Sequence, residues 1–152
     1  MQVTYATEAW SDVVDELAQH WPAHWDEVAM HKDKVPLDPD FAEYARLEAT
    51  GQLHVTVARH RGAVIGYLVA IVRPHLHYKT CLSAFFDLYY VAPSHRLWMT
   101  GVRLFSEAER ALGKRGVKRM FTGTKLSKDA AVIFQRSGWD EAERLFIKYI
   151  GD

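Results

Sequence analysis

The segment between Ala84 and Leu112 constrains the fold more than any other, because it predicts a strand, a tight turn and a helix in direct succession. Residues 84–90 are rich in aromatic side chains that favour strands, and a basic turn after Pro93 ends at Gly101. Apolar side chains then recur at helical spacing. The first N–H groups of such a helix lack partners within it, and its dipole adds about half a positive charge. This segment therefore predicts a phosphate site made of main-chain N–H groups.

Two helices are expected before this segment. A helix capped by Thr7 carries apolar residues at steps of three, four and seven, and it breaks at Trp21-Pro22. The region around residues 36–39 is an irregular connector, because two prolines lie within it. A second helix begins at Phe41, and Gly51 is placed to stop it.

Strands dominate the region that follows. Residues 54–59 and 63–72 predict an antiparallel hairpin around a turn at Arg61-Gly62, and residues 73–79 are expected to be a loop. Further along we expect a strand over residues 80–91, the helix of the phosphate turn up to a stop at Gly113, a strand over 117–122, a helix from a Ser127 cap through Arg136, and a final strand over 144–150. This order predicts an α+β fold in one domain spanning residues 1–152.

Charge is distributed unevenly along the chain. Residues 1–76 carry 6 basic and 11 acidic side chains, whereas residues 77–152 carry 13 and 8, so the halves have net charges of −5 and +5. Much of the basic excess lies near the predicted phosphate turn, as an anionic ligand requires. A solvated helix face accounts for such runs equally well. Nucleic-acid binding is not expected, because no pattern of stacking aromatic residues accompanies the basic run.

The strand, turn and helix resemble motif A of the GNAT N-acetyltransferases, in which V-x-P ends a strand and Q/R-x-x-G-x-G/A follows. Val91, Pro93, Arg96 and Gly101 match that motif, and Met99 stands where it has its first glycine. Residues 129–139 resemble motif B, and the order of elements matches from end to end. The resemblance implies a mixed, mostly antiparallel central sheet with helices on both faces. It also implies acetyl transfer from acetyl-CoA to a primary amine of a small molecule or a protein, by direct attack within a ternary complex.

The resemblance also implies which residues bind acetyl-CoA. The pantetheine arm would lie along the central strand and contact its main chain at Leu88, Tyr89, Tyr90 and Val91. The diphosphate would be held by Arg96, Leu97, Trp98, Met99, Thr100, Gly101 and Val102.

Acetyl transfer needs a base for the amine and a route for a proton to the departing thiolate. Asp87 is the candidate base, because it lies within an otherwise apolar strand where burial would raise its pKa. A structural or solvent-facing role for this carboxylate remains open. The family places a tyrosine in motif B as the acid, but Phe134 stands there. Tyr149, Tyr89, Tyr90 or a water replaces it, or the thiolate leaves unprotonated, or catalysis has been lost.

Four residues are candidates for binding the acceptor. Asp26 and Glu27 lie in the region that faces the substrate in the family and would attract a cationic amine, although a solvated helix face explains them too. His77 and Tyr78 would line the acceptor end of the cleft, or belong to an ordinary polar loop.

Several other classes of protein are not expected. Cys81 is the single cysteine, so an internal disulfide is excluded and a reducing compartment is the natural interpretation. No cluster of ligands suggests a metal site, and no apolar run reaches the ~18 residues that span a membrane. The beginning of the chain does not resemble a signal peptide, so we expect a cytoplasmic protein.

Two further expectations follow from the resemblance. Residues 24–25, 36–39 and 77–79 resemble small GNAT proteins encoded by tailed phages, which would place the protein in the host cytoplasm or the virion. GNAT proteins often form homodimers. The alternative function is a GNAT-shaped protein that binds CoA or a partner, virion or host, with little or no catalysis.

Overall fold

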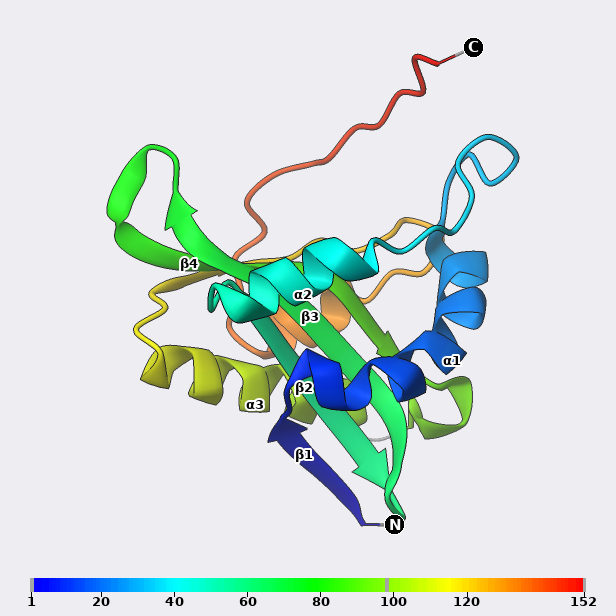
Figure 1. Cartoon of the computed structure of the whole chain (residues 1–152), viewed down its shortest axis with the longest axis horizontal. Helices are drawn as coiled ribbons and strands as arrows, with labels where there is room; N and C mark the ends of the chain where they lie inside the picture. Colours follow the sequence, from blue (N-terminus) through cyan, green and yellow to red (C-terminus); the bar gives the residue numbers. More distant parts are fainter. Residues whose placement is uncertain (1, 98, 152) are drawn as a thin grey trace.

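The computed structural model describes residues 2–97 and 99–151, so the predicted phosphate-site residue Trp98 lies outside the described residues. The chain forms one five-stranded sheet in the order β1-β2-β3-β4-β5 (Figure 1). The strands are β1 (Val3–Thr7), β2 (Leu53–His60), β3 (Ala63–His75), β4 (Tyr78–Val91) and β5 (Arg119–Phe121). Neighbouring strands are antiparallel except β4 and β5, which are parallel.

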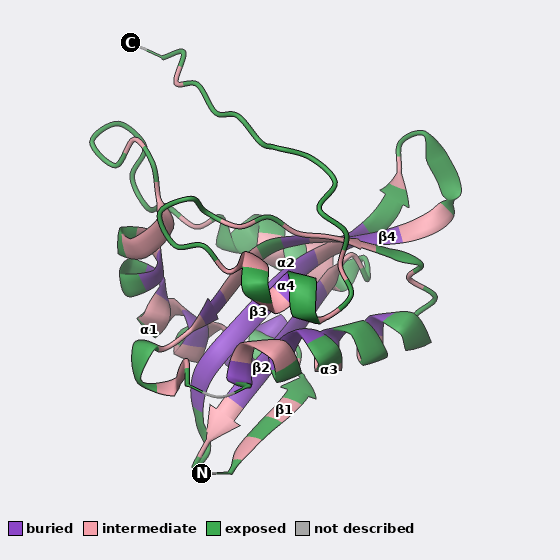
Figure 2. Cartoon of the chain, turned by 180° about the vertical axis from the view of Figure 1, so that it is seen from behind, coloured by how far each residue is buried: buried purple, intermediate pink, exposed green. Residues whose placement is uncertain are grey.

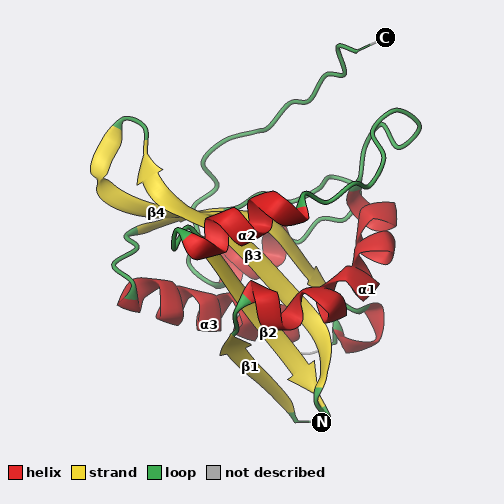
Figure 3. Cartoon of the chain, in the orientation of Figure 1, coloured by secondary structure: helices red, strands yellow, loops and turns green. Residues whose placement is uncertain are grey.

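Helices cover both faces of this sheet (Figure 3). There are two long helices, α1 (Trp10–Val28) and α3 (Thr100–Lys114), and two short ones, α2 (Phe41–Ala49) and α4 (Ala131–Arg136), in the described part of the chain. One core unites α1 with side chains of β2, β3 and β4, and α2 packs at its margin through Tyr44. The other core unites α3 and α4 with the opposite face of the same strands (Figure 2). The α+β class, the mostly antiparallel sheet and the helices on both faces are thus confirmed.

The first helix differs from its prediction in where it begins and in its continuation past Pro22. Thr7 belongs to β1, and α1 begins after Ala9 without a side-chain cap. Pro22 lies inside α1 and does not end it. Trp21 just before the proline and His24 just after it are both buried, so packing on the sheet outweighs the lost helix hydrogen bond. Figure 1 shows that the helix bends along its length, as a proline within a helix predicts.

The predicted turns are confirmed, but the loop between β3 and β4 is not. Gly51 follows α2 with a positive φ, and Arg61-Gly62 form the hairpin turn with φ values of 52° and 85°. Residues 73–79 are mostly strand, because β3 continues to His75 and β4 starts at Tyr78. The pairings of Pro74 with Leu82 and of His75 with Tyr78 show that the ladder extends past Pro74, with a register shift between Pro74 and His75.

The last third of the chain has less regular structure than expected. β5 has three residues, α3 continues past Gly113 to Lys114, and α4 starts at Ala131 rather than after a Ser127 cap. The predicted final strand is wrong: residues 140–151 form neither helix nor strand. This segment, the C-terminal tail, leads away from the sheet (Figures 1 and 2). Among the described residues, no helix combines the length and apolarity needed to cross a membrane.

Candidate active site

The sheet opens where β4 passes β5. These strands pair only over Ser83–Phe85 of β4, so Leu88 to Val91 have no strand on their outer side among the described residues. The Ala92 N–H donates to the carbonyl of Ile65 in β3. Because main-chain groups alternate along a strand, Tyr89 and Val91 direct theirs away from β3, into the opening.

A β-bulge at Asp87 marks the start of this opening. Val69 pairs with Leu88 and Ala70 pairs with Phe86, which leaves Asp87 as the extra residue in β4. The Asp87 side chain is exposed, so the expectation that its apolar strand would bury it is wrong. The bulge turns this carboxylate out of the regular alternation, and its charge helps to raise the pKa of the largely buried Tyr44 to about 12, after burial itself.

The beginning of α3 has the geometry that an anion requires. Met99 precedes the helix, and its carbonyl accepts the first helical hydrogen bond from Arg103, so the N–H groups of Thr100 to Val102 have no acceptor within α3. No acidic residue lies in the first turn. A Cβ atom on Gly101 would lie 3.0 Å from the Cδ1 atom of Ile133, so glycine allows α3 to approach α4.

Arg96 and Glu27, predicted for different sites, form one ion pair. The Arg96 Nη2 donates to both Glu27 carboxylate oxygens at 2.7 and 2.8 Å, and Nε donates to the Val91 carbonyl at 2.7 Å. The guanidinium also lies over the Tyr90 ring, 5.5 Å from its centroid. These contacts fasten the turn after β4 to the end of α1, so the Arg96 charge is directed at Glu27.

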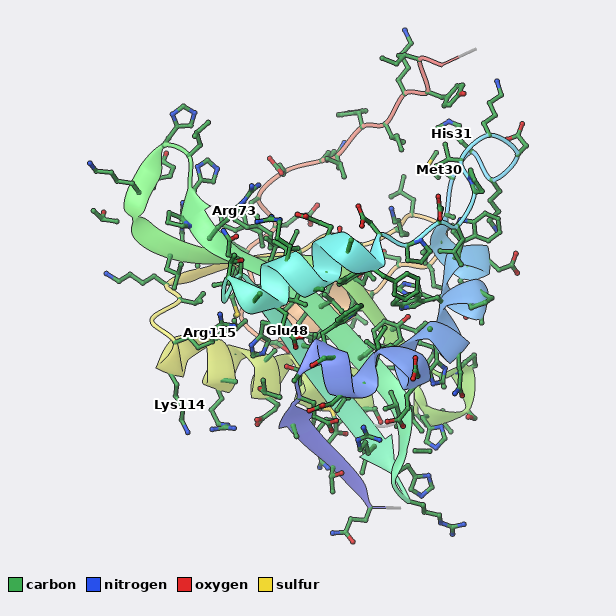
Figure 4. All side chains as sticks on the ribbon, in the orientation of Figure 1. Met30, His31, Glu48, Arg73, Lys114 and Arg115 are labelled. Carbon is green, nitrogen blue, oxygen red and sulfur yellow. The ribbon has the colours of Figure 1, made fainter. Side chains whose placement is uncertain are left out.

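A cavity of about 360 Å³ lies on the α1 side of the bulge. The connector between α1 and α2, residues 29–40, forms one wall, and Asp87 and Leu88 lie at its floor. Its lining is mostly apolar or aromatic and comprises Trp21, His24, Trp25, Val28, Ala29, Met30, Val35, Pro36, Leu37, Asp38, Pro39, Tyr44, Asp87 and Leu88. Figure 4 shows Met30 and His31 where the chain leaves α1.

His24 is a buried, uncharged imidazole beside this cavity. Its Nδ1 lies 2.9 Å from the Tyr67 Oη, and its ring stacks on Tyr90. Burial lowers the pKa of His24 to about 4, so the ring is uncharged at neutral pH. The Tyr67 hydroxyl and the His24 Nδ1 atom thus satisfy each other with one hydrogen bond inside the core.

Tyr89 is the hydroxyl-bearing ring packed on Phe134. The two rings meet edge to face with centroids 5.8 Å apart, and the Tyr89 hydroxyl donates to the Gly123 carbonyl at 2.7 Å. This hydrogen bond spans the opening between β4 and the chain beyond β5. Burial raises the pKa of Tyr89, so its phenol is protonated at neutral pH.

The other predicted site residues lie further from the cavity. His77 and Tyr78 lie at the β3–β4 hairpin tip, at the opposite end of the sheet from the connector (Figure 1). Asp26 is exposed and pairs with Lys32 at 3.1 Å. Tyr149, in the C-terminal tail, lies against the connector, with its ring 5.8 Å from that of His31 and 4.8 Å from the Lys34 ammonium.

Two parts of the site were missing from the sequence prediction. The connector wall was interpreted only as an irregular segment, because loops carry no periodic signal. His24 was overlooked because the helix was expected to break at Pro22. The spacing of Trp21, His24, Trp25 and Val28 is itself helical and could have placed these residues on one face.

Comparisons with known proteins agree with this geometry. The family model "Acetyltransferase (GNAT) family" matches residues 10–139. A search of curated proteins finds no match.

Solved structures resemble the chain over nearly its whole length. A ribosomal-protein-alanine N-acetyltransferase from Brucella melitensis biovar Abortus 2308 has a TM-score of 0.76 at 15% identity, covering 100% of both chains. The aminoglycoside acetyltransferase HMB0005 from an uncultured soil metagenomic sample has a TM-score of 0.74 at 16% identity, covering 99% of this chain and 100% of the other. The aminoglycoside N-acetyltransferase AAC(6')-Iy in complex with CoA has a TM-score of 0.74 at 16% identity, covering 98% and 95%.

The structural likenesses establish the fold, and the family match extends over most of the sequence, including the strand, turn and helix around Gly101. The chain therefore belongs to the GNAT acetyltransferase family, enzymes whose acetyl donor is acetyl-CoA.

Proposed function

We propose that the protein transfers the acetyl group of acetyl-CoA to a primary amine by direct attack within a ternary complex. The observation that carries this proposal is the convergence of three features on the bulge at Asp87. The opening between β4 and β5 starts there, the cavity on the α1 side ends there, and the turn that leads to α3 follows at the end of the same strand. A donor and an acceptor bound in these places would meet at Leu88.

The residues present fit acetyl-CoA. The main chain of Leu88, Tyr89, Tyr90 and Val91 borders the opening and would bind the extended pantetheine arm as a neighbouring strand. The free N–H groups of α3 would hold the diphosphate, as the family motif implies for Arg96, Leu97, Met99, Thr100, Gly101 and Val102. Arg96 contributes by fixing the turn through Val91 and Glu27.

The chemical roles fall to two residues of β4. Asp87 is the carboxylate at the cavity floor and would bind the ammonium group and accept its proton. Tyr89 is better placed than Tyr149 to protonate the thiolate, because its hydroxyl crosses the opening next to Phe134. Tyr149 lies against the connector at His31 and Lys34.

A protein that binds CoA without catalysis is the second candidate. Phe134 has no proton to donate, and Met99 brings a half-exposed side chain to the start of α3 where the motif has glycine. Both departures favour this alternative.

Thermal unfolding with CoA, set beside thiol release from acetyl-CoA with a panel of amines, separates the candidates. CoA at a hundredfold above its Kd should stabilise the protein by about 2.7 kcal/mol, which raises Tm by several degrees. Thiol release with any amine supports the enzyme. A Tm shift without thiol release across the panel would instead support the binding protein.

Glycine variants at the two ends of α3 test the phosphate site. Gly101→Glu should abolish the CoA-induced Tm shift, because it adds a negative charge and bulk among the free N–H groups. Gly113→Glu is the matched control at the other end, where an added Cβ meets no atom within 4 Å. Gly101→Ala adds only a Cβ atom near Ile133, so a folded Gly101→Ala variant shows that the protein tolerates this contact. An unchanged shift in a folded Gly101→Glu variant would remove the phosphate-site assignment.

A further inference from the structure

The lining and size of the cavity beside Asp87 indicate which kind of acceptor would fit it. Its walls come from three aromatic side chains, Trp21, Trp25 and Tyr44, and from the apolar connector. Connector residues Met30, Val35 and Leu37 are each more than 40% exposed, so apolar surface reaches solvent at the cavity rim. A volume of about 360 Å³ is at the small end of the range for ligand sites. The cavity therefore fits a compact, apolar body.

The charges around the cavity fit one cationic group at its floor. No lysine or arginine lines it, and its carboxylates are Asp87, at the floor, and Asp38, on the connector. Asp87 has no hydrogen bond or ion pair with any residue in the described part of the chain. The other nearby acids, Asp26 and Glu27, are already neutralised by Lys32 and Arg96. A polycation would find no carboxylates here for most of its ammonium groups.

Two buried rings, Trp21 and His24, belong to the same lining. Trp21 is 6% exposed, and its Nε1 is buried without a hydrogen-bond partner among the described residues. His24 is neutral, and its Nδ1 is already paired with the Tyr67 hydroxyl. Because the Trp21 Nε1 has almost no accessible surface, a molecule in the cavity contacts the Trp21 ring and not its N–H, which leaves Asp87 and Asp38 as the charged groups of the lining.

We propose that the acceptor is a small monoamine whose single ammonium group binds Asp87 and whose aryl or alkyl body lies between Trp21, Trp25 and Tyr44. This proposal rests on the proposed acetyl transfer and specifies its acceptor. After Asp87 accepts one proton, the amine nitrogen forms a bond to the acetyl carbon as the carbon–sulfur bond breaks. The sulfur leaves with the bonding electrons and takes up a proton, and the second proton from nitrogen goes to solvent.

Turnover across matched amines tests the acceptor class. With acetyl-CoA, we expect 2-phenylethylamine to give a kcat/KM about 100-fold above that of ethylamine, because binding transfers the apolar phenyl ring from water into the cavity. Spermidine and kanamycin should be poorer acceptors than 2-phenylethylamine. If either polyamine is the better acceptor, the monoamine proposal is overturned while acetyl transfer stands.

Calorimetry on the CoA-loaded protein tests the cavity without turnover. We expect 2-phenylethylamine to bind, and Asp87→Asn to weaken that binding by about tenfold or more. The uncharged 2-phenylethanol should bind the wild type and Asp87→Asn equally. Binding without thiol release from any amine would support the cavity and contradict the proposed function. Absence of binding by both probes overturns the proposal.

Leucine variants locate the binding site. Leu37→Ser should weaken binding of 2-phenylethylamine severalfold, since Leu37 lines the cavity. Leu76→Ser is the matched control, because Leu76 is 90% exposed at the hairpin tip and lines neither the cavity nor the core. Equal affinities in these two variants would show that the amine binds elsewhere.

Discussion

His24 and His54 are two histidines that folding removes from water. His24 contacts Tyr67 and Tyr90 on one side of β3, and His54 contacts Thr56 and Arg115 from β2. Burial lowers the pKa of each to about 4, against an ordinary value of 6.5, with the Arg115 charge adding to the effect at His54. Both rings are therefore neutral in the folded protein at neutral pH. As the pH falls, they take up protons in the unfolded chain at a higher pH than in the folded protein.

These two histidines predict a loss of stability on mild acidification. Between pH 6.5 and about 4 the unfolded chain binds more protons than the folded one, so the free energy of unfolding falls as the pH falls. Each histidine contributes a loss of about 2 kcal/mol by pH 5. Urea unfolding at pH 7.0, 6.0 and 5.0 measures this slope.

Asparagine variants identify the groups responsible. The slope should be smaller in His24→Asn and His54→Asn, whatever their stability at pH 7. His77→Asn should keep the wild-type slope, since His77 is exposed at the hairpin tip. A wild-type slope in both buried-site variants would show that other groups cause the acid sensitivity.

Single residues show what sequence reasoning about the site can foresee and what it cannot. The apolar strand around Asp87 predicts a buried carboxylate. The structure instead has Asp87 exposed at a bulge that lines the cavity, and no sequence pattern predicts this bulge. The sequence predicts that Arg96 binds the diphosphate and that Glu27 attracts the acceptor amine. Their ion pair joins residues 69 positions apart, and only the folded chain brings them together.

Pro22 is the feature of α1 that predicts an engineering outcome. Proline within a helix removes one hydrogen bond and crowds the preceding turn, at a cost of about 3 kcal/mol relative to alanine. Pro22 itself is exposed, so no core contact depends on its ring. We expect Pro22→Ala to raise the free energy of unfolding by about 1 to 3 kcal/mol in urea titrations.

A second proline gives the opposite expectation. Pro36 lies in the connector, outside any helix, where proline stabilises by restricting the unfolded chain. Pro36→Ala should therefore lower the free energy of unfolding by up to about 1 kcal/mol. If Pro22→Ala also destabilises, the bend of α1 is required for its packing on the sheet, and the proline is structurally necessary.

Elements with a strong local period were the predictable ones. The apolar stripe of α3 and the turn at Arg61-Gly62 follow from spacing and from the need for positive φ. Errors arose where distant packing decides. Pro74 was interpreted as ending a strand, yet β4 extends the ladder across it. Residues 144–150 have strand propensity but no strand pairs with them.

The C-terminal tail gives the whole molecule an unusual apolar surface. Leu145, Phe146 and Ile150 are each close to 90% exposed, and Ile147 is 62% exposed. Burying a side chain of this kind is worth about 1.5 to 3 kcal/mol, so the tail favours association with another apolar surface. The expected homodimer stays a prediction, and the tail is the segment best suited to carry it.

Truncation tests this expectation. We expect the full chain to self-associate at micromolar concentrations in sedimentation velocity, and a chain ending at residue 143 to be monomeric. Phe146→Ser with Ile147→Ser should weaken association, whereas Leu76→Ser, which removes an equally exposed side chain elsewhere, should not. A full chain that is monomeric at 100 µM or more, roughly the upper range for such weak contacts, would contradict it.

The candidate site as a whole could not have been assembled from the sequence. Its proposed cofactor side is one continuous segment, from Leu88 to Val102, which the resemblance to motif A points to directly. Its acceptor side combines α1, the connector, α2 and β4, in pieces that lie between residues 21 and 88 of the chain. Local periodicity places each piece on a face but gives no information on which faces meet.

The bulge in β4 means that this fold could lose its proposed base without losing its architecture. Phe86 lies in the core beside α3, and Leu88 faces the core beside α1, with Asp87 as the supernumerary residue between them. Excising that one codon would restore strict alternation and leave each neighbouring side chain on the face it already occupies. A one-residue deletion could thus remove the proposed base in a single step, with a folded protein still produced.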